Sequence, residues 1–271
     1  MTWKLRTFMA KKELKYKTFE RSKVFTNFKK CFSWILTKKP KIVFRGDKSD
    51  FNEPTVFISN HWLDGTAGLY CNEVYFPFKF APVGRFEVFL SFIKRWRYVY
   101  RFNHRLRRGL GVIGAWFAAT FESFFGLFFY HRCRAIPSYN DMRSMSTFKM
   151  CYQCLDEGIS LMIYPERLNH GYNNVFLDLI SGFSLIIKGY FKHSGKEVKV
   201  CAVYYSKQTN QMIIDTPISA LDMFNEGKTK EEISLYFAER MNKLYMDYVL
   251  PVHEKAEVDY RKKNKTDDIL I

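Results

Sequence analysis

The chain lacks the features that identify many scaffold and enzyme classes. Its six cysteines are scattered through 271 residues, so it is not a small disulfide scaffold, and we expect reduced thiols. No G-x-S-x-G stretch occurs, which leaves a serine hydrolase of the nucleophile-elbow type unsupported. The sequence has no internal repeat and no low-complexity tract. We expect no cleavable leader, because residues 1–20 alternate charged and apolar side chains.

Two short patterns have ligand-like spacing without the rest of the motif. Cys151 and Cys154 are spaced like a zinc pair, but a structural zinc site usually needs a second pair. Both also fall in a helical pattern, where such cysteines usually belong to the core. Gly109-Leu-Gly-Val-Ile-Gly114 has the glycine spacing of a dinucleotide loop, but a basic, polar stretch precedes it in place of a strand. We therefore predict no metal and no nucleotide cofactor.

Acidic residues are scarce, with 27 Asp and Glu against 43 Lys and Arg. The basic residues gather in two blocks. Residues 1–41 contain thirteen Lys or Arg and two Glu, and residues 85–108 contain eight Lys or Arg and one Glu. Such blocks on a near-neutral remainder indicate a polyanionic partner, either nucleic acid or anionic lipid. Because an apolar run adjoins the second block, we predict anionic membrane lipids as the partner and no nucleic acid.

Two segments have the pattern of membrane contact. Residues 19–36 predict an amphipathic helix with one aromatic face and one cationic face. The aromatic face comprises Phe25, Phe28, Phe32, Ile35 and Leu36. Residues 109–130 are almost wholly apolar and approach the roughly 20 residues that a bilayer span needs. The alternatives are a helix packed on its own domain for the first segment and a buried core helix for the second.

These segments define the predicted domain organisation. Residues 1–40 form a basic, amphipathic membrane-binding segment, and residues 41–271 form one domain with an apolar insertion at about 105–131. For the insertion we favour contact with the membrane over a full span, because its central Glu122 costs about 2.5–3.5 kcal/mol in lipid.

Strand and helix patterns alternate along the domain. Strands are predicted at 41–46, 55–59, 159–164, 198–205 and 212–214, and helices from about 65, at 142–155 and at 176–192. Thr229 and Glu232 form a capping-box pattern that begins a long final helix. This alternation predicts an α/β fold with a central, mostly parallel sheet flanked by helices, preceded by the N-terminal amphipathic membrane helix.

Polar clusters follow two of the predicted strands. Asn60-His61, with Asp64 three residues on, follows the strand at 55–59, and Pro165-Glu166-Arg167 follows the strand at 159–164. Ligands of open α/β sheets bind outside the carboxyl ends of strands, so the clusters converge if the two strands are neighbours. A histidine oriented by a carboxylate can remove a proton from an alcohol. The alternative for His61 alone is a satisfied turn histidine.

The order of these motifs, from about Lys41 to Tyr205, resembles that of the glycerolipid (lysophosphatidate-type) acyltransferases. Asn60-His61 matches the start of that family's Asn-His-x4-Asp motif, although the Asp position of that motif holds Thr66 here. Pro165-Glu166 matches the centre of its Phe-Pro-Glu-Gly-Thr-Arg motif.

Two further regions fit the family's order less closely. Arg134-Ala-Ile-Pro-Ser-Tyr-Asn140 resembles its Gly-x-Ile-Pro-x-x-Arg motif, with Arg143 as the nearest downstream arginine. Val200-Cys-Ala-Val203 stands where the family has its last strand motif, without that motif's proline. The chain thus resembles a divergent member of the family.

The resemblance implies a membrane-associated acyltransferase of phospholipid biosynthesis at the cytoplasmic face. His61, oriented by Asp64, would be the general base acting on a lysophospholipid acceptor such as lysophosphatidate. Arg143, Glu166 and Arg167 would hold the glycerol phosphate. The donor would be an acyl-CoA or acyl-carrier-protein thioester, with no cofactor and no metal.

Two alternatives to this function remain. One is a phospholipid–lysophospholipid transacylase that uses the same histidine without a thioester. The other is a membrane-binding protein with an acyltransferase fold and a degraded site.

Overall fold

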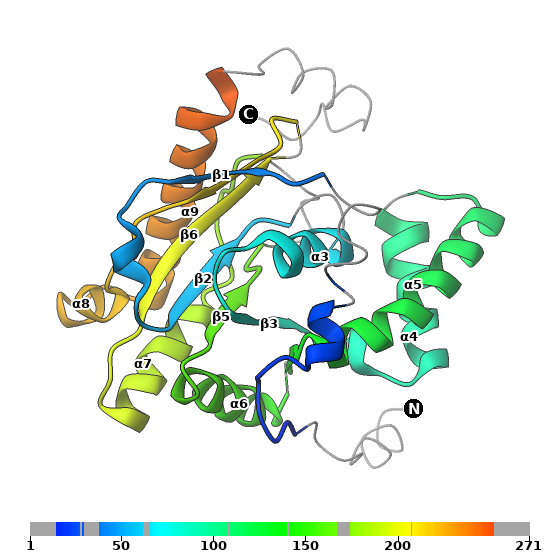
Figure 1. Ribbon diagram of the computed structural model, residues 1–271, viewed down its shortest axis with the longest axis horizontal. Coiled ribbons are helices and arrows are strands. Elements are labelled where there is room, and N and C mark those ends of the chain that lie inside the picture. Colours follow the sequence, from blue (N-terminus) through cyan, green and yellow to red (C-terminus); the bar gives the residue numbers. More distant parts are fainter. Residues whose placement is uncertain are drawn as a thin grey trace.

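The computed structural model describes residues 15–27, 29, 38–61, 65–107, 109–139, 141–166, 174–206 and 208–251. Its centre is a seven-stranded sheet of order β1-β7-β6-β2-β5-β3-β4 (Figure 1). The strands are β1 (Lys41–Phe44), β2 (Thr55–Ser59), β3 (Phe80–Arg85), β4 (Ile136–Ser138), β5 (Ser160–Ile163), β6 (Lys199–Ser206) and β7 (Gln211–Ile214). β7 runs antiparallel to β6, and the other neighbouring pairs are parallel. The predicted mostly parallel α/β fold is confirmed.

Helices cover both faces of this sheet because its central strands are apolar on both sides. Val56 and Ile58 of β2 face one core with Leu161, whereas Phe57 and Met162 face the other, as the two-residue period of a strand requires. The first core is closed by α6 (Ser144–Asp156), α7 (Gly182–Ser194), α8 (Ala220–Asn225) and α9 (Lys230–Tyr248). The second is closed by α3 (Gly65–Tyr75) and the end of α5 (Val112–Arg132).

Two predicted helix starts have different outcomes. The capping box of Thr229 and Glu232 begins α9 as predicted. In contrast, α7 begins at Gly182 and not at residue 176. The side chain of Asn242 accepts a hydrogen bond from the Phe176 N–H at 2.7 Å and donates one to its carbonyl at 2.8 Å. The main chain there is thus satisfied by α9, without a helical turn of its own.

The described part of the N-terminal segment packs on the domain. Tyr16, Phe19 and Phe25 are buried, and the Phe25 ring lies 5.8 Å from that of Phe129. For Phe25, packing on the chain's own domain is therefore what the structure shows. The rest of the predicted aromatic face, from residue 28 onward, lies outside the described residues.

The connection between β3 and β4 is a helical lobe that projects from the sheet (Figure 1). It contains the short turn η2 (Phe86–Phe89), α4 (Phe92–Tyr98), η3 (Val99–Arg107) and α5. The buried Arg95 guanidinium holds the lobe at its base by donating to the carbonyls of Val88 and Leu90, both at 3.2 Å. Of the helices that the structure describes, α5 is long and apolar enough to cross a membrane, by length and composition.

Candidate functional site

The two polar clusters meet at one edge of the sheet. β2 pairs with β5 in parallel, so the strands end side by side, as the convergence of the clusters required. Glu166 is buried, and one of its carboxylate oxygens accepts the His61 main-chain N–H at 2.5 Å. The other oxygen lies 3.6 Å from His61 Nδ1. A carboxylate from a distant part of the chain therefore faces the imidazole.

The main chain around Glu166 is held by the segment that leads into α7. Glu166 forms a bridge with Leu179, and the Ile180 N–H donates to the Pro165 carbonyl at 2.7 Å. These main-chain contacts do not involve the carboxylate, so they hold the Glu166 backbone in place whatever the charge of its side chain. The carboxylate lies at the end of β2, where it accepts the His61 N–H.

Asn60 fixes the position of His61 from the other side. Its side-chain amide donates to the Tyr205 carbonyl at 2.9 Å and accepts from the Tyr205 N–H at 2.8 Å. These two bonds continue the β2–β6 pairing past Ser59, which is the last paired residue of β2. The side chain of the asparagine before the histidine thus links the ends of β2 and β6, a role that the sequence motif alone does not reveal.

The His61 ring lies next to the aromatic ring of Tyr164. Its centroid lies 5.0 Å from that of Tyr164, whose hydroxyl accepts a hydrogen bond from Asn72 of α3 at 2.8 Å. Burial raises the pKa of Tyr164, so its hydroxyl is neutral. The His61 side chain keeps 15% of its surface exposed, which leaves it within reach of a substrate while its neighbours are fixed.

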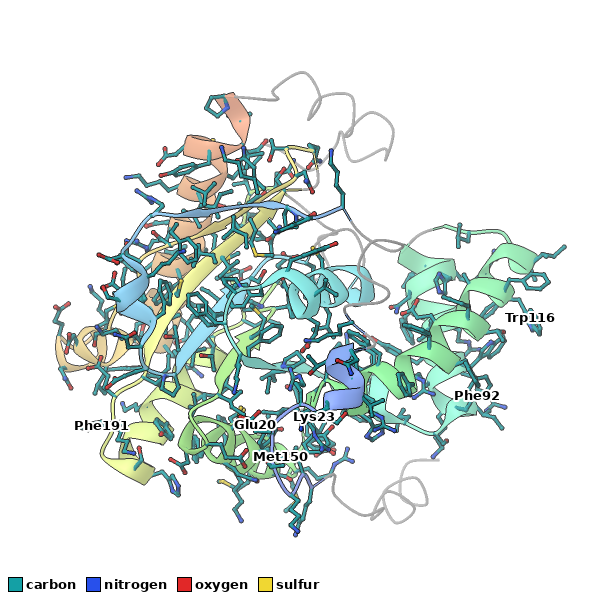
Figure 2. All side chains as sticks on the ribbon, viewed as in Figure 1. Glu20, Lys23, Phe92, Trp116, Met150 and Phe191 are labelled. Carbon is teal, nitrogen blue, oxygen red and sulfur yellow. The ribbon has the colours of Figure 1, made fainter. Side chains whose placement is uncertain are left out.

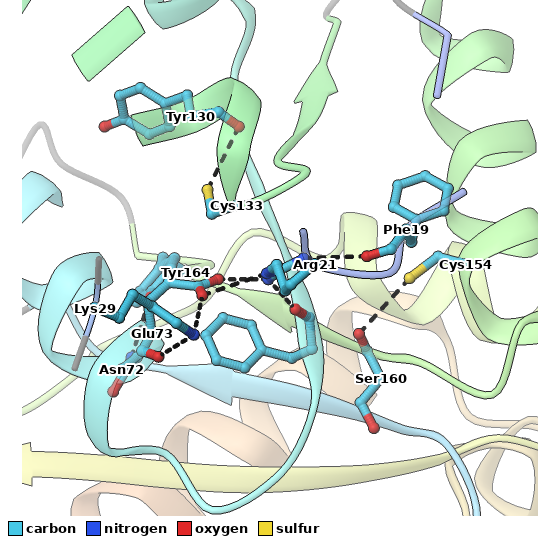
Figure 3. Close-up of polar contacts among 11 residues, drawn as sticks. Phe19, Arg21, Lys29, Asn72, Glu73, Tyr130, Cys133, Cys154, Ser160 and Tyr164 are labelled. Carbon is cyan, nitrogen blue, oxygen red and sulfur yellow. Dashed lines mark hydrogen bonds and ion pairs between the residues drawn. The ribbon is translucent and has the colours of Figure 1, made fainter. Parts of the chain in front are cut away.

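Glu73, the acidic residue next to Asn72, links the N-terminal segment to α3 through ion pairs (Figure 3). Glu73 is buried and accepts Arg21 Nη2 at 2.5 Å and Lys29 Nζ at 3.2 Å. Burial acts to lower the pKa of Arg21, but the charge and hydrogen bond of Glu73, together with smaller effects of the buried cysteines, raise that pKa overall. Arg21 also donates to the Phe80 carbonyl at the start of β3. A lone acid in an apolar helix pattern was the signal for this cluster, which our sequence interpretation did not use.

Arg143 lies at the same sheet edge, but farther along it. It follows β4, which is three strands from β2 in the sheet order, or about 14 Å at the usual strand spacing. Its guanidinium forms hydrogen bonds of 2.6 to 3.1 Å with the Asp141 carboxylate and stacks over the Tyr139 ring at 4.3 Å. The structure therefore does not place Arg143 beside His61 and Glu166.

Arg85 is a cation of this edge that our sequence interpretation missed. It ends β3, one strand closer to β2 than Arg143. Its guanidinium pairs with Glu87 at 2.8 Å, and half of its side chain is exposed. Its position after a strand was a usable signal, although the crowded basic block at 85–108 obscured it.

Two predicted site residues, Asp64 and Arg167, lie outside the described residues. Their roles stay predictions. Among the residues that the structure describes, no group of three or more His, Cys, Asp or Glu side chains could hold a metal ion. Cys151 and Cys154 lie on α6 and are both buried in the core, as expected for core cysteines.

No protein-family model matches the chain. No curated protein matches it either. We therefore infer the function from the geometry of the site and from the motif resemblance.

Proposed function

We propose that the protein is a membrane-associated acyltransferase that moves a fatty acyl group from a thioester to a lysophospholipid such as lysophosphatidate. One observation carries the proposal: a partly exposed histidine at the carboxyl end of β2 faces a buried carboxylate, Glu166, through Nδ1. Such a pair is suited to removing a proton from an alcohol. The motif resemblance adds the identity of that alcohol.

In the proposed step, His61 Nε2 takes the proton from the acceptor hydroxyl. The oxygen attacks the thioester carbonyl carbon to form a tetrahedral oxyanion. The carbon–sulfur bond then breaks, and the imidazolium returns its proton to the departing thiolate. The products are the acylated phospholipid and a free thiol. Glu166, 3.6 Å from Nδ1, would stabilise the imidazolium in between and favour the neutral tautomer that carries its proton on Nδ1.

This assignment gives Glu166 a positioning role in place of the phosphate-binding role that the resemblance implied. Asp64 stays the second candidate to orient His61, because residues three apart share one helix face. Arg143 and Arg167 stay candidates for the acceptor phosphate, since guanidinium groups bind phosphate oxygens in pairs. Arg85 joins them, because β3 ends nearer to His61 than β4 does.

The direct test is formation of phosphatidate from lysophosphatidate and labelled acyl-CoA by the purified protein. We expect His61→Ala to abolish it, and His193→Ala to leave it unchanged, because His193 is an exposed residue at the end of α7. Activity that survives His61→Ala would overturn the assignment of the base. Asp64→Asn in the same assay shows whether that acid contributes to catalysis.

Departures from the family motifs favour a second candidate, a membrane-binding protein with a degraded site. The positions of the family's Asp and Arg hold Thr66 and Asn140. Such a protein would bind anionic vesicles and turn over neither lysophosphatidate with acyl-CoA nor a phospholipid acyl donor. Turnover with the phospholipid donor alone would instead select the transacylase.

A membrane location at the cytoplasmic face belongs to this proposal. It is supported by the apolar helix α5 and by the basic blocks of the sequence, which suit anionic lipid headgroups.

A further inference from the structure

The outer face of the lobe formed by α4, η3 and α5 is covered by bulky apolar side chains. On α5, Phe117, Phe121 and Phe124 are 65%, 72% and 77% exposed. Other large apolar side chains that are exposed on the described part of the lobe include Phe92, Ile93, Phe102, Leu106, Ile113 and Trp116. Figure 2 shows Phe92 and Trp116 on the side of the lobe away from the sheet. A surface patch of this kind marks an interaction site.

The inner face of α5 has the opposite character. Ala115, Ala119, Ser123 and Gly126 are buried there at spacings of three and four residues. A helix of a water-soluble pair turns its large apolar residues toward its partner. Over residues 112–126 of α5, a helix against which α4 and η3 pack, every buried residue is small, whereas Phe117, Phe121 and Phe124 are exposed. Small residues between helices with apolar residues outside are typical of packing in lipid.

Several polar side chains of the lobe are paired with one another between its helices. Glu122 of α5 lies 3.0 Å from His104 Nε2 and accepts a hydrogen bond from Asn103 at 3.3 Å. Trp96 Nε1 donates to the Thr120 hydroxyl at 2.9 Å. The acid that makes α5 a costly membrane segment is thus satisfied between the helices.

A basic stripe accompanies the apolar face. Lys94, Arg97, Arg101 and Arg105 are exposed and follow one another at spacings of three and four residues, which places them along one side of α4 and η3. Cations beside an apolar helix face are suited to the boundary between acyl chains and anionic headgroups.

These features distinguish insertion into one leaflet from a full crossing. Both ends of the lobe join neighbouring strands, β3 and β4. If α5 crossed the bilayer, α4 and η3 would have to cross with it and carry their basic stripe through the hydrocarbon, which is costly. Insertion in the membrane plane keeps the stripe at the headgroups.

We propose that the α4–η3–α5 lobe is an inside-out helical hairpin that inserts its Phe-rich face into one leaflet of an anionic bilayer. The lobe begins where β3 ends, at the sheet edge that carries His61. Insertion would therefore bring that edge to the membrane surface. The inference concerns binding and holds whether or not the chain transfers acyl groups.

The first test measures binding of the full chain to vesicles of phosphatidylcholine and phosphatidylserine by flotation. For Phe117→Ser/Phe121→Ser/Phe124→Ser we expect a loss of affinity of about 100-fold or more, because three large side chains no longer leave water. The matched control, Leu177→Ser/Leu235→Ser/Met246→Ser, replaces exposed apolar residues elsewhere and should bind like the wild type. Unchanged binding of the Phe variant would overturn the proposal.

A second variant addresses the stripe without touching apolar packing. Lys94→Gln/Arg97→Gln/Arg101→Gln should weaken binding by about 100-fold at low salt, from roughly fivefold per cation, and flatten its salt dependence. Equal binding to vesicles of phosphatidylcholine alone would contradict the role of anionic headgroups. Thermal melts of both variants should match the wild type, because the replaced side chains are exposed.

The third test determines on which side of the membrane the tip of the hairpin lies. Gly111 lies at the tip of the hairpin, has no neighbouring atom within 4 Å of an added Cβ, and has an ordinary φ of −58°. In a Cys31→Ser background, Gly111→Cys should react with an impermeant maleimide added outside the vesicles. Protection from that reagent would mean that the tip crosses the bilayer. A wild-type dimer that the Phe variant loses, with vesicle binding unchanged, would make the face a contact between copies. Either result overturns the proposal.

Discussion

Replacing Glu166 by glutamine removes the charge that faces His61 and keeps the shape of the site. Two unit charges 3.6 Å apart attract by about 1 kcal/mol in water and by about 5 kcal/mol at the effective dielectric constant of a protein surface. The His61 side chain, 15% exposed, lies between these limits. Since about 1.4 kcal/mol is a factor of ten in rate, we expect kcat to fall roughly 10- to 1,000-fold.

The same substitution should barely change stability. A glutamine keeps an oxygen that can accept the His61 N–H, which Glu166 accepts at 2.5 Å. Glu166→Ala loses that acceptor and leaves a buried N–H without it, which costs about 1–3 kcal/mol of the free energy of unfolding. Glu166→Gln therefore measures the loss of the charge, and Glu166→Ala adds the loss of the hydrogen bond.

Steady-state assays with lysophosphatidate and labelled acyl-CoA, together with urea unfolding, measure both quantities. For kcat, Glu157→Gln is a matched control, because it removes a carboxylate from the end of α6, away from the site. If Glu166→Gln keeps kcat within about twofold of the wild type while His61→Ala is inactive, the carboxylate has no electrostatic role and our reasoning is refuted.

Three further predictions concern stability and thiol chemistry. Glu73→Ala should lower the free energy of unfolding by about 3 kcal/mol, because Arg21 and Lys29 lose their shared partner. Urea unfolding measures this loss, and a value near zero would contradict the role of the buried cluster. Burial raises the pKa of Cys71 to about 11 and that of Cys151 to about 12, so the five described cysteines, all buried, should not react with Ellman's reagent at about pH 8 without denaturant; rapid reaction of two or more thiols would contradict this. Burial acts to raise the pKa of Glu157, but hydrogen bonds from the Phe19 N–H, Gln153 and Thr18 outweigh it and lower that pKa. Its stabilising effect is therefore present above the ordinary value of 4.5 and is lost as pH falls through the folded-state pKa. Glu157→Gln should reduce the acid dependence of unfolding measured in urea, and an unaltered pH profile would argue against those bonds.

The strands that carry the site were predictable because their signals are local. The apolar runs at 55–59 and 159–164 predicted the ends of β2 and β5 to within a residue or two. A strand that is apolar on both faces gives a continuous apolar run, which is easily recognised in a sequence. The short β4, in contrast, has three residues and was not predicted. It is a strand because it pairs with β3, a partner that its own residues do not specify.

The sequence by itself determined the alternation of strands and helices, the two polar clusters at strand ends and the apolar insertion, because each depends on residues close together in the chain. It directed attention to Asp64 as the partner of His61 for the same reason. The sequence also marked Glu166 as a site residue, but only the tertiary structure showed that its carboxylate, 105 residues away, faces His61, because the pairing of β2 with β5 places their carboxyl ends together. Likewise, composition marked α5 as apolar, but only its packing against α4 and η3 decided that small residues are buried over residues 112–126 while Phe117, Phe121 and Phe124 are exposed.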